Sequence, residues 1–189
     1  MGVASVAKSF TIDMWLARQT PQKVLPILHK VLESVKEEFA DAVANGGDGI
    51  YCVGYCFGAR YALLLGGELH KDVVAGQRSP DTQAEEGMVK QGPMIKCAAI
   101  AHGIIDSKDE VGHATVPTYI VAIEGDSLFE DRIREEGVKV LHEKKVEHEV
   151  SVYKDVPHGF AVLGNYEDQG IAQKQSEAFD GMLGWLKAH

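Results

Sequence analysis

The chain has 189 residues, of which 45% are hydrophobic and 25% are charged, a balance typical of a soluble globular domain. The formal net charge of −9 at pH 7 argues against nucleic acid or an anionic membrane as a partner, because both bind through basic surfaces. We therefore expect one domain over residues 1–189 with a small molecule as its partner.

The sequence predicts a cytoplasmic protein. No apolar stretch is long enough to cross a bilayer, and residues 1–10 lack the apolar core of a secretory signal. The three cysteines show no disulfide-framework spacing, which fits a reducing compartment and leaves a thiol available for chemistry.

The first half of the chain predicts a helix, a strand and a second helix. Apolar residues recur at helical spacing over residues 21–39, with Thr20 as the N-cap and Pro21 as the first helical residue. A short strand over residues 50–53 is followed by a glycine-flanked turn and a helical run. Residues 76–93 are polar and unpatterned, which indicates a surface loop.

The second half predicts strands that alternate with helices. The strands are expected over residues 97–102, 118–123 and 148–153, and the helices over residues 130–144 and 172–187. The last strand alternates apolar and polar residues, as a strand toward a sheet edge does. This order predicts an α/β fold with a mostly parallel sheet covered on both faces.

Residues 54–58 read Gly-Tyr-Cys-Phe-Gly, which is the G-x-S-x-G nucleophile elbow with Cys56 in place of serine. The two glycines would allow a tight turn between strand and helix, and the helix N-terminus would favour a thiolate. The N–H of Phe57 is the candidate oxyanion donor. The alternative is a buried structural cysteine, and this is how we interpret Cys52 and Cys97.

An acid and a histidine follow in the order that α/β-hydrolases use. Asp126 comes directly after the strand 118–123, and His158 follows the strand 148–153. Open α/β sheets place their sites at these strand ends. The alternatives are a surface turn for Asp126 and a capping role for His158.

We expect no metal and no cofactor. No second Cys or His pair at ligand spacing accompanies Cys52 and Cys56. Residues 54–58 also lack the G-x-G-x-x-G pattern of a dinucleotide site.

These motifs together resemble the dienelactone hydrolase family of α/β-hydrolases, in its fungal form. The resembling stretches are residues 12–14, 53–65, 123–126 and 157–164 with the closing helix. The resemblance implies a three-layer α/β-hydrolase fold and hydrolysis of lactones or esters without a cofactor. It also matches Cys56, Asp126 and His158 to the family's catalytic triad.

Four further residues are candidates for substrate contact: Tyr55, Arg60, His102 and Phe160. His102 is similar to a histidine of fungal relatives, and a merely packed histidine is the alternative. Arg60 either anchors the helix after the elbow or reaches an acidic substrate group.

The chain departs from the family pattern in two places. Members normally have several strands before the helix that precedes the elbow, and one loop there supplies a second oxyanion donor. Without them the strand 50–53 becomes a sheet edge, so we expect a homodimer, with residues 3–14 as the exchanged or covering segment. An arginine that grips a substrate carboxylate is also missing after His158, which favours a neutral or larger lactone.

The leading hypothesis is a lactone or ester hydrolase that uses a cysteine nucleophile. The alternative is a protein that kept the fold without hydrolysis and serves as a binding partner, a cyclase or an isomerase.

Overall fold

The computed structural model describes residues 14–44, 49–78, 90–162 and 164–189. The chain divides into two compact units, residues 1–41 with 70–90 and residues 42–69 with 91–189. The expectation of a single domain stays a prediction.

The first unit contains the long helix α2 (Pro21–Glu38) and the short helix α5 (Lys71–Val74), which contact each other. Thr20 is the extended N-cap residue of α2 and Pro21 opens the helix, as predicted. The segment after α5 lies so close to the start of α2 that position 76 must be glycine, and Gly76 has φ +77°. A Cβ atom there would overlap the Gln22 carbonyl oxygen.

Three short elements lie next to the boundary between the units. They are α3 (Ala40–Ala44), which follows α2, and the strands β2 (Leu69–His70) and β3 (Lys90–Gln91), which pair with each other. Residues 79–89 of the predicted loop 76–93 lie outside the described residues.

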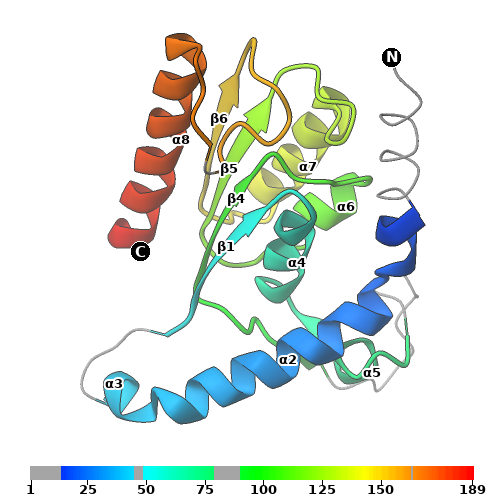
Figure 1. The fold of residues 1–189 in the computed structure, drawn as a ribbon. Coiled ribbons are helices and arrows are strands. Elements are labelled where there is room, and N and C mark those ends of the chain that lie inside the picture. The colour runs from blue at the N-terminus through cyan, green and yellow to red at the C-terminus, as the bar shows by residue number, and fades with distance from the viewer. Residues whose placement is uncertain (1–13, 45–48, 79–89, 163) are drawn as a thin grey trace. The chain divides into compact units, whose positions relative to one another are not determined.

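The second unit is built on a parallel sheet in the order β1-β4-β5-β6. The strands are β1 (Tyr51–Tyr55), β4 (Cys97–Ala101), β5 (Thr118–Ile123) and β6 (His148–Tyr153). The helices are α4 (Phe57–Leu65), α6 (Lys108–Val111), α7 (Asp131–Glu143) and α8 (Gln169–Ala188). Figure 1 shows α8 on one face of the sheet and α4, α6 and α7 on the other. The predicted α/β fold is confirmed.

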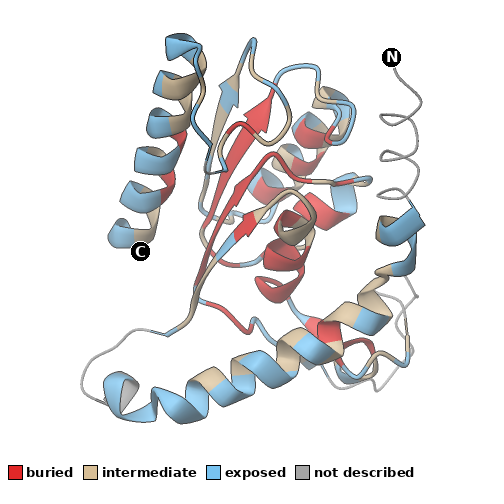
Figure 2. Cartoon of the chain, viewed as in Figure 1, coloured by how far each residue is buried: buried red, intermediate tan, exposed pale blue. Residues whose placement is uncertain are grey.

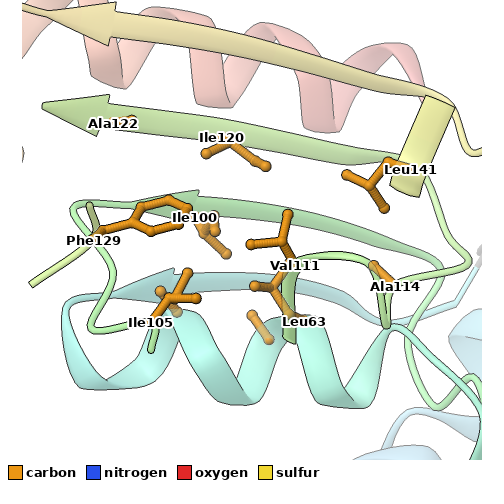
Figure 3. Close-up of a cluster of buried hydrophobic side chains, with 11 residues drawn as sticks. Leu63, Ile100, Ile105, Val111, Ala114, Ile120, Ala122, Phe129 and Leu141 are labelled. Carbon is orange, nitrogen blue, oxygen red and sulfur yellow. The ribbon is translucent and has the colours of Figure 1, made fainter. Parts of the chain in front are cut away.

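The core of this unit lies on both faces of the two central strands. Every residue of β4 and β5 is buried, as Figure 2 shows. Ile100 and Ile120 point to the face of α4, α6 and α7, where Figure 3 shows them with Leu63, Val111, Phe129 and Leu141. Ala99, Val121 and their alternate neighbours pack on the other face against residues of α8. Burial on both faces explains why these strands are continuous apolar runs.

Several element boundaries differ from the sequence predictions for identifiable reasons. Strand β1 extends to Tyr55 because its parallel pairing with β4 continues to that residue. Helix α8 begins at Gln169 because the Asp168 carboxylate accepts hydrogen bonds from two N–H groups of its first turn. The short helix α6 was not predicted, and Ser107 caps it by accepting a bond from the Asp109 N–H.

Strands β1 and β6 lie at the two ends of the described sheet. The edge position of β6 agrees with its alternating pattern. On β1, Val53 leaves 45% of its surface exposed. Pairing of β1 with a second copy stays a prediction, and the proposed covering segment lies, except for Met14, outside the described residues. No helix of the described chain is long and apolar enough to span a membrane.

We predict that Val53→Lys shifts a dimer to monomer, because a lysine on an edge strand opposes pairing with another strand. The matched control is Val152→Lys on β6, where the valine is 43% exposed. Light scattering at micromolar concentration should give about twice 20.6 kDa for the wild type and the control. A folded wild-type monomer of 20.6 kDa would contradict this prediction.

Candidate active site

The turn after β1 holds Cys56 in an unusual backbone conformation, with φ 51° and ψ −118°. Such a conformation costs a non-glycine residue about 1–3 kcal/mol, so its surroundings must hold it in place. The Cys56 N–H donates to the Ala101 carbonyl at 3.1 Å, and the Cys56 carbonyl accepts from the N–H groups of Ala59 and Ile104, each at 3.1 Å. Strand β4 and the chain after it therefore fix the turn that presents the thiol.

The two glycines of the elbow have different roles. A Cβ atom on Gly54 would lie 2.7 Å from the Gly58 carbonyl oxygen and 2.8 Å from Ala59 Cα, so the turn requires glycine there. A Cβ atom on Gly58 would meet no atom of the described chain within 4 Å. Both glycines were expected to serve the tight turn, and the structure requires this only of Gly54.

The structure brings Cys56, His158 and Asp126 together at one edge of the sheet. Nε2 of His158 lies 3.3 Å from the Cys56 sulfur, and Nδ1 lies 2.7 Å from Oδ2 of Asp126. Asp126 follows β5 and His158 follows β6, so the parallel strands deliver both side chains to the end of the sheet where β1 delivers the thiol.

The Asp126 carboxylate is held on both oxygens. Oδ2 contacts the imidazole, and Oδ1 accepts a hydrogen bond from the Leu128 N–H at 3.0 Å. A proton on Nδ1 of His158 satisfies this carboxylate and leaves the Nε2 lone pair directed at the thiol. The arrangement can therefore accept a proton from Cys56.

The other two thiols differ from Cys56 in their surroundings. Burial raises the pKa of Cys52 to about 11, and its side chain packs against the core on the side of α4. Cys97 has no exposed surface, and burial raises the pKa of its thiol as well. Both placements agree with the prediction that these cysteines are core residues.

His102 lies directly after β4, with φ 38° and only 1% of its surface exposed. Its ring centroid is 5.1 Å from that of His158 and 5.8 Å from that of Tyr55. Neither ring nitrogen has a hydrogen-bond partner in another described residue. Burial, and secondarily the neighbouring His158, lowers the pKa of His102 to about 4. The ring is therefore neutral near pH 7.

Arg60 is engaged within the fold. Its guanidinium bonds to the Glu110 carboxylate and lies 3.9 Å from the Asp106 carboxylate. Glu110 is 8% exposed, and burial raises its pKa against the opposing effect of Arg60. The pair connects α4 to α6, which supports the anchoring role that the sequence analysis considered. Glu110 was missed because nothing in its local sequence marks it as buried.

A cavity of about 540 Å³ is lined by Tyr55, the residue before Cys56, by the segment after His158 and by α8, but not by Cys56, Asp126 or His158 themselves. Its lining residues include Tyr55, Ala161, Val162, Gln175, Phe179 and Asp180. Tyr55 lines this cavity, and its contact with substrate stays a prediction. Phe160 has no exposed surface and packs against Tyr153, so it supports the site from the core. The residues contributed by α8 were missed, because their helical pattern indicates packing alone.

Comparisons with known proteins find related hydrolases. The profile of the Dienelactone hydrolase family matches residues 84–189. Hydrolase pyvD of Aspergillus violaceofuscus is 29% identical over 181 residues, which cover 96% of this chain and 62% of that protein. Dienlactone hydrolase 1 of Gibberella moniliformis is 24% identical over 178 residues, 94% of this chain and 58% of that protein. The chain thus spans about 60% of the length of these curated relatives.

A crystal structure shows the same fold. It is that of a protein assigned as a dienelactone hydrolase from Klebsiella pneumoniae subsp. pneumoniae, with a TM-score of 0.60 and 16% identity. The match covers 92% of this chain and 64% of that one. The family profile covers more than half of the chain, including the segments that carry Asp126 and His158. The chain therefore belongs to the dienelactone hydrolase family.

Proposed function

We propose that the protein hydrolyses a carboxylic ester or lactone, with Cys56 as nucleophile, His158 as base and Asp126 as the acid that orients the base. The observation that carries this proposal is the position of the His158 ring, within hydrogen-bonding distance of both the Cys56 sulfur and the Asp126 carboxylate. Membership of a hydrolase family supports it.

The geometry supports a two-step reaction. His158 takes the Cys56 proton, and the thiolate attacks the substrate carbonyl while Asp126 stabilises the imidazolium. The N–H of Phe57, at the positive end of α4, faces the developing oxyanion in this proposal. The C–O bond then breaks, and His158 returns the proton to the leaving alcohol. Water, deprotonated by His158, cleaves the thioester and restores the thiol.

A site that uses the Phe57 N–H as its one oxyanion donor is expected to turn over slowly. Only the Phe57 N–H is assigned here as an oxyanion donor, and loss of one donor from such a site typically costs about 100–1000-fold in rate. In the family pattern a second donor comes from a loop before the helix that precedes the elbow.

We propose a neutral ester or lactone as the substrate. We take the cavity that Tyr55 lines as the substrate pocket; it carries one acid, Asp180, and no Lys or Arg among the described residues that line it. An anionic substrate would gain no attraction there. The neutral His102 ring also offers no positive charge near pH 7.

We predict that p-nitrophenyl acetate is cleaved slowly and that Cys56→Ala reduces this turnover to the uncatalysed rate. The matched control is Cys52→Ala, which removes a thiol of β1 that packs against the core on the side of α4 and should keep most of the activity. Initial rates followed by p-nitrophenolate absorbance test this. Unchanged turnover in Cys56→Ala would contradict the assignment of Cys56 as nucleophile. Binding of a lactone without turnover would favour the non-hydrolytic alternative.

We predict that iodoacetamide near neutral pH modifies Cys56 first. The raised pKa values of Cys52 and Cys97 keep their thiolate fractions small, and burial limits access to Cys97. Peptide mass spectrometry after brief labelling should find modification at Cys56, and the denatured protein should label at all three cysteines. Equal labelling of the three in the folded protein would refute the assignment.

The buried, neutral His102 predicts a loss of stability in acid. Its folded-state pKa of about 4 lies below the usual 6.5, so between these values the unfolded chain binds the proton more readily than the folded chain. The neutral His102 ring therefore contributes to the free energy of unfolding above pH 6.5. This contribution is lost as the pH falls toward 4, by up to about 3 kcal/mol. Urea unfolding from pH 7 to 4 should show a smaller loss in His102→Asn than in the wild type. Equal pH dependence in the two proteins would contradict this.

A further inference from the structure

Three side chains that can bind a metal ion lie together at the carboxyl end of the sheet, where the proposed triad is. The Cys56 sulfur and one ring nitrogen each of His102 and His158 all lie within 4.8 Å of one another. Each residue follows a different strand, β1, β4 or β6, so no sequence spacing indicates the cluster. The sequence analysis therefore expected no metal site.

His102 provides an independent observation. Its ring is almost completely buried, and both nitrogens are without a hydrogen-bond partner in the rest of the described chain. Buried polar atoms in proteins normally have a partner, so two ring nitrogens without a partner in another described residue, beside a thiol and a second imidazole, point to a ligand. A neutral imidazole offers a lone pair, which suits a cation.

We propose that Cys56, His102 and His158 bind a thiophilic divalent cation of the Zn²⁺ class, and that the bound cation reversibly blocks the active site. Zinc bonds of about 2.3 Å to sulfur and 2.0–2.1 Å to nitrogen place tetrahedral ligand atoms about 3.3–3.7 Å apart. The Cys56 sulfur and Nε2 of His158 are already 3.3 Å apart. The three ligand atoms lie within 4.8 Å of one another, so metal binding requires the His102 nitrogen to approach the other two atoms by up to roughly 1 Å.

The second layer of contacts also suits a metal. Asp126 accepts a hydrogen bond from Nδ1 of His158, and such a carboxylate-histidine pair commonly orients a zinc ligand. Three protein ligands leave a fourth position for water. Binding replaces the Cys56 thiol proton, which passes to solvent, and no oxidation or reduction occurs.

The bound cation would occupy the two atoms that hydrolysis needs. The Cys56 sulfur could no longer attack a carbonyl, and Nε2 of His158 could no longer accept a proton. Only this inhibitory effect rests on the proposed function, because metal binding is measured without substrate.

The first test uses Co²⁺ as a spectroscopic probe with the purified, reduced chain. We expect a thiolate-to-cobalt charge-transfer band in the near ultraviolet that disappears in Cys56→Ala. Competition with a chromophoric chelator should show that His102→Asn weakens Zn²⁺ binding by at least tenfold. Asparagine is chosen because it tolerates the positive φ of this position. The control His142→Asn removes an exposed histidine outside the cluster and should leave the affinity unchanged.

The second test measures p-nitrophenyl acetate hydrolysis during Zn²⁺ titration. We expect activity to fall with the same midpoint as binding and to return when EDTA is added. Absence of the cobalt band, or Zn²⁺ affinity equal in the wild type, Cys56→Ala and His102→Asn, would overturn the metal site. Full activity of the zinc-saturated protein would overturn the inhibition. A cobalt band in a chain without esterase activity would leave the metal site supported and the hydrolase proposal refuted.

Discussion

The bond between the Cys56 N–H and the Ala101 carbonyl is the constraint on which the rest of the site depends. It continues the pairing of β1 with β4 by one residue, into a position where the backbone has turned to positive φ. Because the Cys56 carbonyl also accepts two bonds, the neighbouring chain holds the turn from both sides of the residue. The turn ends the strand, starts α4 and sets the direction of the thiol. His158 and Asp126 can act on the thiol only because the turn directs it toward them.

Much of the fold could be predicted because burial leaves clear patterns in the sequence. The strands 118–123 and 148–153 have the predicted bounds, one as a continuous apolar run and the other as an alternating edge strand. Parallel strands have their carboxyl ends on the same side of the sheet. A nucleophile motif and two polar residues that follow strands were therefore enough to predict that Cys56, Asp126 and His158 lie together.

The remaining features depend on contacts between segments that are distant in sequence. The Arg60–Glu110 pair forms because α6 packs beside α4, and nothing local distinguishes Glu110 from a solvated acid on a short helix. The burial of His102 likewise follows from the rings of Tyr55, His158 and Phe160 around it. Its unpaired nitrogens, from which we infer a cation site, could be recognised only once these neighbours were in place.

The distance along the chain between Cys56 and His158 has a consequence for biosynthesis. The two residues are 102 positions apart, and they meet only through the successive pairing of β1, β4, β5 and β6. Such long-range contacts form late, because closing the loop costs conformational entropy before the contacts that offset this cost are made. On the ribosome, Cys56 therefore emerges long before His158. The thiol gains its imidazole neighbour only when β6, the last strand of the described sheet, is in place.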